Sequence, residues 1–87
     1  MSSSSDSELQ LLSALLMDVR ATLESMGRCV TTAQANVKVL RHRPTEATVQ
    51  DMTSCLDTLV REAEVIIDCA NGCRAPLGVM LESGHRE

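Results

Sequence analysis

Hydrophobic residues recur every three or four positions through the first half of the chain. The spacing alternates between three and four over 8–41 without a break, which predicts one long helix with an apolar seam. Pro44 disfavours helical geometry in the residue before it, so a turn is expected at 42–46. The apolar positions are Leu9, Leu12, Leu16, Val19, Leu23, Met26, Val30, Ala33, Val37 and Leu40.

A second periodic segment follows the turn and predicts a helix over 47–71. Thr45 or Thr48 can cap its first turn, because a threonine hydroxyl accepts a hydrogen bond from a free backbone N–H. Asn71-Gly72 is typical of a helix end, and Pro76 follows, so 74–87 is expected to be a tail with a short apolar segment. The apolar positions of this helix are Val49, Met52, Leu56, Leu59, Ala63, Ile66 and Ala70.

The two apolar seams mirror each other about Pro44. Folding the chain there pairs Leu40 with Val49, Val37 with Met52, Ala33 with Leu56, Val30 with Leu59, Met26 with Ala63, Leu23 with Ile66, and Val19 with Ala70. Charge supports the same arrangement, since five cations and three anions lie within 8–43, whereas six anions and one cation lie within 46–68. The sequence therefore predicts an all-α protein whose residues 8–73 form an antiparallel, coiled-coil-like helical hairpin.

Some apolar side chains are not covered by the contact between the two helices, which predicts a partner interface. Helix one projects past helix two. Helix two carries further apolar residues beside its seam, and an apolar stripe of this width suits a helical bundle. The predicted interface consists of Leu9, Leu11, Leu12, Leu15, Leu16, Val60 and Ile67. Either the tail covers part of it, through Leu77 and Met80, or a partner helix does. We favour the partner, from a second copy or from another coiled-coil subunit, because so much exposed leucine is a liability.

Composition restricts the partners to proteins. The 87 residues include no aromatic residue, and the net charge is −4, so neither base stacking nor attraction to nucleic acid is expected. No apolar stretch approaches the roughly 20 residues that span a bilayer, and the leucine-rich run lacks the basic flank of a secretory signal. We therefore expect a disordered polar tail at 1–7, no membrane insertion, and an intracellular, cytoplasmic location.

Neither the cysteines nor the histidines form a recognisable site. Cys69 and Cys73 make a single C-x-x-x-C. Paired motifs of this spacing in helical hairpins resemble the small chaperones of the mitochondrial intermembrane space, but the second motif is missing here. Reduced, structural thiols are the prediction. His42 and His85 have no neighbouring nucleophile, and no phosphate-loop or zinc-protease motif occurs, so we expect no enzyme activity, no metal, no cofactor and no small-molecule substrate.

These observations favour a non-catalytic structural or adaptor subunit of a multi-protein helical-bundle assembly. In outline the chain resembles the small subunits of eukaryotic organelle-positioning and kinetochore complexes, a likeness of architecture alone. Two alternatives remain open at this stage. A small helical chaperone for an aggregation-prone client has the same length, charge and helical content. A small all-helical dimeric enzyme that binds an anionic metabolite would need cations in a bundle cavity, and no cation falls on either seam.

Overall fold

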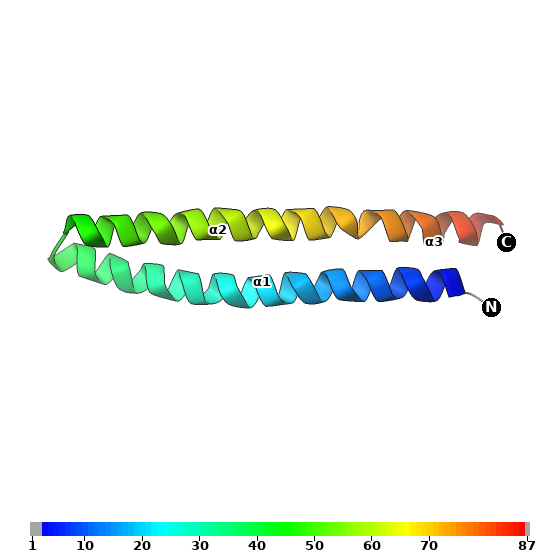
Figure 1. Cartoon of the computed structure of the whole chain (residues 1–87), viewed down its shortest axis with the longest axis horizontal. Helices are drawn as coiled ribbons and strands as arrows, with labels where there is room; N and C mark the ends of the chain where they lie inside the picture. Colours follow the sequence, from blue (N-terminus) through cyan, green and yellow to red (C-terminus); the bar gives the residue numbers. More distant parts are fainter. Residues whose placement is uncertain (1–2, 87) are drawn as a thin grey trace.

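The protein is an elongated pair of antiparallel helical rods. The computed structural model describes residues 3–86, which form α1 (Ser3–His42), α2 (Glu46–Gly72) and α3 (Arg74–Arg86). The first rod is α1, and the second consists of α2 and α3 in line, so that both ends of the chain lie at the same end of the molecule (Figure 1). No strand occurs among the described residues. The predicted all-helical hairpin is confirmed.

The turn forms where Pro44 and Thr45 predict it. The Arg43 N–H donates to the Val39 carbonyl at 2.7 Å, which closes the last turn of α1. Thr45 then has extended backbone angles (φ −103°, ψ 157°), and its hydroxyl accepts from the Thr48 N–H at 3.2 Å. Of the two candidate threonines, Thr45 is therefore the N-cap, because its side chain satisfies an N–H that has no partner within the helix.

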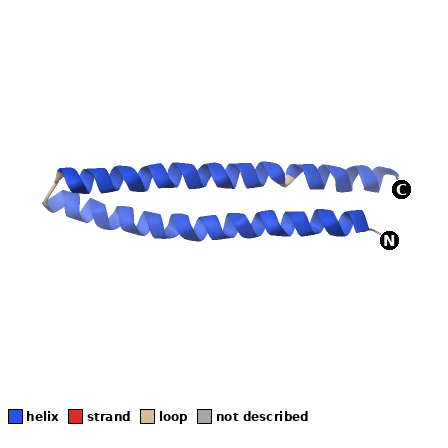
Figure 2. Ribbon diagram, viewed as in Figure 1, coloured by secondary structure: helices blue, strands red, loops and turns tan. Residues whose placement is uncertain are grey.

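The segment predicted as a C-terminal tail is helical. Cys73 separates α2 from α3 (Figure 2), but its own backbone angles are helical (φ −71°, ψ −19°) and its N–H donates to the Cys69 carbonyl at 3.1 Å. Gly72 does not reverse the chain, since no glycine of the described part has a positive φ. Pro76 lies in the first turn of α3, where its missing N–H would have no partner in any case. The rod therefore continues alongside α1.

The N-terminal segment also differs from the prediction. Helix α1 begins at Ser3, five residues before the predicted start, and Met1 and Ser2 of the predicted disordered tail lie outside the described residues. No proline or glycine within 3–7 opposes helix formation, and Asp6 in the first turn complements the positive end of the helix dipole. Ser7, the residue before the predicted start, consequently lies inside the helix.

The molecule has the dimensions of a thin rod. It measures 66 × 14 × 14 Å, and its radius of gyration is 19.6 Å, compared with roughly 12 Å for a compact domain of this length. Among the described side chains only Ala33 and Pro76 are buried. None of the three helices, over the described residues, combines the length and apolar character that a membrane-spanning segment requires. Two helices in contact thus give a single seam rather than an enclosed core.

Candidate partner interface

The two rods meet along a seam of half-buried residues, which we call the closed seam. On α1 it runs through Leu12, Leu15, Val19, Thr22, Met26, Cys29, Ala33, Asn36 and Leu40; on α2 and α3 it runs through Thr48, Met52, Cys55, Leu59, Glu62, Ile66, Cys69, Cys73, Pro76 and Met80. The spacing alternates between three and four on both rods, as in a coiled coil. The closed seam includes seven residues of the predicted hairpin seam: Val19, Met26, Ala33, Leu40, Met52, Leu59 and Ile66.

Contacts around Cys55 set the register of the closed seam. The Cys29 thiol donates to the Cys55 carbonyl at 3.3 Å, and the Asn36 amide donates to the Cys55 sulfur at 3.9 Å. Cys55 therefore lies level with Ala33, which occupies the same face of α1 between those two residues and is only 8% exposed. The sequence pairs Ala33 with Leu56, so the predicted register is one residue away from the observed one.

The predicted seam is corrected in its rotation. Several residues expected between the helices, such as Leu23 and Leu56, are exposed instead. Together with further apolar residues they form rows with seven-residue intervals on both rods. We call this surface the open face. It consists of Leu9, Leu16, Leu23, Val30 and Val37 of α1, with Val49, Leu56, Ala63 and Ala70 of α2 and Leu77 of α3; all are exposed except Ala63, which is half-buried. Leu23 is 55% exposed and Leu56 is 50% exposed.

Small side chains explain which face closes. Thr22, Cys29 and Asn36, which are small or polar, lie at the α1 side of the contact, and Ala33 is the most buried described side chain of α1. Short side chains let two helix backbones approach closely along a narrow strip. The long aliphatic side chains one position further on, such as Leu23, project to the side of the contact. A contact between two helices has no room for both the short side chains and the long aliphatic ones. The long aliphatic side chains therefore remain exposed.

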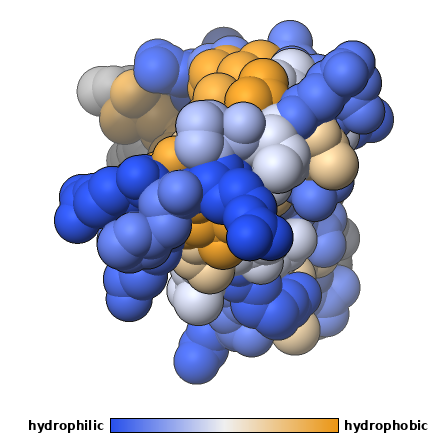
Figure 3. Space-filling view, turned by 90° about the vertical axis from the view of Figure 1, so that its left-hand side faces the viewer, coloured by the Kyte–Doolittle hydropathy of each residue, from blue (hydrophilic) through white to orange (hydrophobic). Residues whose placement is uncertain are grey.

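Both sets of exposed residues lie on one side of the hairpin. At about 100° per residue, the open-face positions of each helix are displaced in the same rotational sense from its closed seam. The helices are antiparallel, so equal senses of rotation turn both rows toward the same side of the plane that contains the two rods. Where hydrophobic side chains reach the surface, they lie between hydrophilic ones, as the view onto the turn end shows (Figure 3). The open-face residues of both rods therefore lie on one side of the hairpin.

The predicted interface residues divide between the two surfaces. Leu9 and Leu16 belong to the open face, whereas Leu11 is exposed on the other side of the closed seam. Leu12 and Leu15 are half-buried against the second rod, and the backbone of Gly72 packs on Leu15, since a Cβ there would lie 3.4 Å from Leu15 Cδ1. The internal alternative therefore holds for these two leucines, because α3 continues the rod past them.

Val60 and Ile67 widen the open face. Both are exposed, Val60 by 61% and Ile67 by 56%. Each lies one helical turn from open-face residues of α2, Val60 from Leu56 and Ile67 from Ala63, and neighbours at this spacing share a surface of the helix. Their role as a second apolar flank of a partner interface stays a prediction. The sequence pattern does not predict the polar residues of the closed seam, because hydrophobic periodicity gives no signal for them. Only their position between two apolar residues of the heptad repeat indicates them.

Glu62 is the least favourable residue of the closed seam. Its Oε1 atom is buried, and no hydrogen-bond partner is present among the described residues. Such an acceptor loses its hydration on folding without gaining a protein partner.

We expect Glu62→Met to stabilise the hairpin. The substitution removes the unpaired carboxylate and keeps an unbranched side chain in the seam, so the free energy of unfolding should rise by about 1 kcal/mol or more. Thermal unfolding followed by circular dichroism measures the change. Glu64→Met is the matched control, because Glu64 is exposed and its replacement should stay within about 0.5 kcal/mol. Equal effects of both substitutions would contradict the burial of Glu62.

The four cysteines are free thiols, all half-buried. Partial burial raises the pKa of the Cys29 thiol above its ordinary value of 9.0, and the neighbouring Cys55 thiol and the Glu62 carboxylate act in the same direction. A raised thiol pKa means that Cys29 is protonated, and hence a poor nucleophile, at neutral pH. Its donated hydrogen bond to Cys55 fits a thiol that packs and bonds between the helices.

The predicted ion pairs between the helices do not form. Folding the sequence at Pro44 places Arg20 near Asp68, Arg28 near Glu62 and Lys38 near Asp51. In the described part of the chain, Arg20 instead pairs with Glu24 of its own helix, with Nε and Oε1 3.9 Å apart and both side chains exposed. The pairs fail because these cations lie on the outer surface of α1 and not at the edge of the closed seam.

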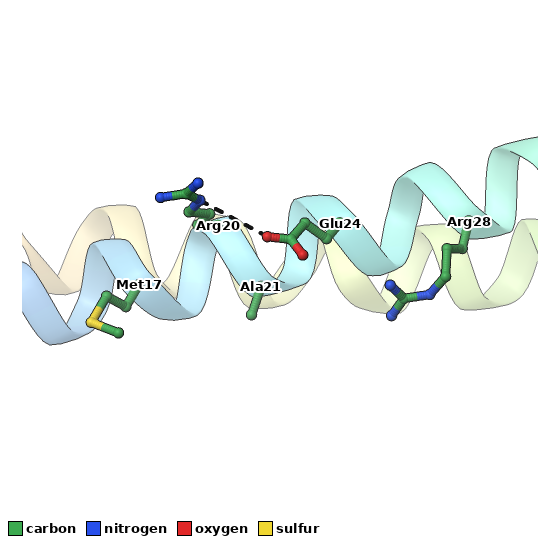
Figure 4. Close-up of a pocket in the computed structure, with 5 residues that line it drawn as sticks. All are labelled: Met17, Arg20, Ala21, Glu24 and Arg28. Carbon is green, nitrogen blue, oxygen red and sulfur yellow. Dashed lines mark ion pairs between the residues drawn. The ribbon is translucent and has the colours of Figure 1, made fainter.

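Open depressions lie on the surface of α1. Figure 4 shows one of them, lined by Met17, Arg20, Ala21, Glu24 and Arg28, all from the same helix. A second is lined by Gln34, Val37, Lys38 and Arg41. A single helix forms each depression, so neither holds a ligand between two elements. Over the described residues no group of three or more His, Cys, Asp or Glu side chains is placed to hold a metal ion.

Comparison with known proteins adds no relative to this description. No family model, curated protein or solved structure matches the chain.

Proposed function

We propose that the protein is a non-catalytic structural or adaptor subunit of a helical-bundle assembly. It acts by protein–protein interaction, and the open face with its Val60 and Ile67 flank is the binding surface. An intracellular, cytoplasmic location belongs to the same proposal. The observation that carries it is the direction in which the apolar side chains point, which is not the direction of the neighbouring helix.

The angle between those two directions can be estimated for each helix. On α1 the closed seam is centred between Leu12 and Leu15, whereas the apolar stripe is centred between Leu12 and Leu16, a difference of about 50° at 100° per residue. The corresponding residues of α2, Met52 with Cys55 and Met52 with Leu56, give the same difference. In a square four-helix bundle the centre lies about 45° from the direction of an adjacent helix. The apolar side chains thus point where a bundle core would lie.

The exposed area supports the same conclusion. The chain has an accessible surface of 6667 Å², against about 5000 Å² for a compact monomer of 9.4 kDa. The excess is about twice the roughly 800 Å² that each partner buries in a standard protein–protein interface. A hairpin that docked its open face would approach the surface of an ordinary folded domain.

Light scattering after size exclusion, combined with circular dichroism, tests this proposal on the purified chain. We expect either a helical oligomer or a poorly helical chain that gains helicity with a partner, because one seam of two helices contributes little stability. A fully helical monomer that persists at high protein concentration would contradict it, since the open face would then have no need of a partner.

A further inference from the structure

We propose that the partner at the open face is a second copy of this chain, arranged so that the two hairpin turns lie at the same end. This inference rests on the proposed function and adds the identity and orientation of the partner. The two copies are related by a two-fold axis parallel to the rods. Each α1 then packs on the α2 and α3 rod of the other copy, and all neighbouring helices are antiparallel, as in an up-down-up-down bundle.

The sizes of the open-face residues favour this orientation. The register set by Ala33 and Cys55 places Leu23 within about 3 Å of Ala63 along the rod axis, and Leu16 within about 3 Å of Ala70. A two-fold axis parallel to the rods preserves these heights. Leu23 of one copy therefore faces Ala63 of the other, and a large side chain meets a small one, which lets a layer fill without voids.

The opposite orientation packs poorly. A two-fold axis perpendicular to the rods would place α1 against α1, and Leu23 lies near the middle of α1. Leu23 would then meet its own copy while Ala63 and Ala70 faced one another. The first contact is overfilled and the second leaves a cavity, and both faults are destabilising.

Charge favours the same choice. The segment 8–43 carries five cations and three anions, and 46–68 carries six anions and one cation. With the turns at the same end, every contact between copies joins the more basic helix to the more acidic one. At the rim, Arg41 of one copy is level with Glu46 of the other. Exposed pairs of this kind contribute little stability, but they discriminate between orientations, because like charges would otherwise face each other.

The flank of the open face is also complementary between copies. In the register set by Ala33 and Cys55, Val60 lies within about one residue of Gly27 of the other copy along the rod axis. A Cβ on Gly27 would have no heavy atom within 4 Å, so the surface there is open. The missing side chain leaves space into which the exposed Val60 of the other copy fits.

Two measurements on the full chain test the arrangement. Light scattering should give twice the chain mass with high helicity. Donor and acceptor dyes on the α-amino groups of mixed copies should show efficient energy transfer, because both amino termini then lie at one end, whereas opposite ends would separate them by most of the 66 Å length. A dimer with weak transfer overturns the orientation.

Volume exchange tests the facing pair. Leu23→Ala should weaken the dimer by about 30-fold or more, and Ala63→Leu should weaken it as well. The double variant Leu23→Ala with Ala63→Leu should recover most of the affinity, since the layer volume is restored. Ala21→Leu is the matched control, because Ala21 is exposed on the outer surface, and it should leave the dimer mass unchanged. Additive losses in the double variant would overturn the pairing.

The failure of this inference can be distinguished from the failure of the proposed function. A chain that is poorly helical alone at every concentration overturns the second copy as partner but leaves a foreign helical partner for the proposed function. A higher homo-oligomer without energy transfer overturns the orientation alone. A stable helical monomer overturns both.

Discussion

Ala33→Glu is expected to unfold the isolated hairpin. Ala33 is only 8% exposed and lies between the two residues of α1 that bond to Cys55, so a glutamate there must either bury an unpaired charge or push the helices apart. The free energy of unfolding should fall by about 3 kcal/mol or more, which a protein with a single seam cannot tolerate. The helical signal in circular dichroism at 25 °C should largely disappear.

The neighbouring alanine supplies the control for that substitution. Ala35 is exposed, and Ala35→Glu keeps the same change of charge and nearly the same helix propensity. Its effect on the free energy of unfolding should stay within about 0.5 kcal/mol. If the two glutamates lowered stability equally, Ala33 would not lie in the contact between the helices, and the observed register would be wrong.

The elements and register of this fold follow from a few residues of the sequence. Pro44 ends the first helix and Thr45 caps the second, because both act through local backbone chemistry. The mirrored spacing predicts the partner of Ala33 to within one residue of the observed one, Cys55. Two regular helices joined by a short turn can differ in register only by a shift of one helix along the other.

The rotation of the helices does not follow from the same pattern. Spacing of three and four identifies the apolar stripe of a helix, and the prediction follows if the other helix of the hairpin covers the centre of that stripe. The structure instead closes on Cys29 and leaves Val30 exposed. Small and polar side chains determine where two helices approach each other. A prediction from hydrophobicity alone instead places the contact at the centre of the apolar stripe. The discrepancy between the two is what points to a further partner.

The C-terminal segment differs from its prediction for a local reason. Gly72 and Pro76 are both common at helix ends, so together they predict a break. The structure places Pro76 in the first turn of α3, where a proline is tolerated, and buries it against the rest of the hairpin. Because Pro76 lies in the first turn of a new helix, the rod continues past it. Helix α3 therefore covers Leu12 and Leu15.

Truncation after Gly72 is expected to unfold part of α1 as well as remove α3. The N-terminal part of α1 lies beside α3, and without it Leu12 and Leu15 lose their cover (Figure 1). Helical segments shorter than about 12–15 residues are marginal in water unless they pack on a partner. The loss of helical signal should therefore be about twice that expected from the 13 residues of α3 alone.

Two full-length variants separate this effect from the loss of chain length. Met80 is half-buried against α1, and Met80→Glu should detach α3 and reproduce most of the loss. The adjacent Leu81 is 63% exposed, so Leu81→Glu should leave the helical signal unchanged. If Met80→Glu also had no effect, and the truncated chain kept its helicity per remaining residue, α1 would be stable without α3. Leu12 and Leu15 would then be available to a partner, as the sequence first indicates. The expected contrast between Met80 and Leu81 follows from the same rotation of the second rod that leaves the open face exposed.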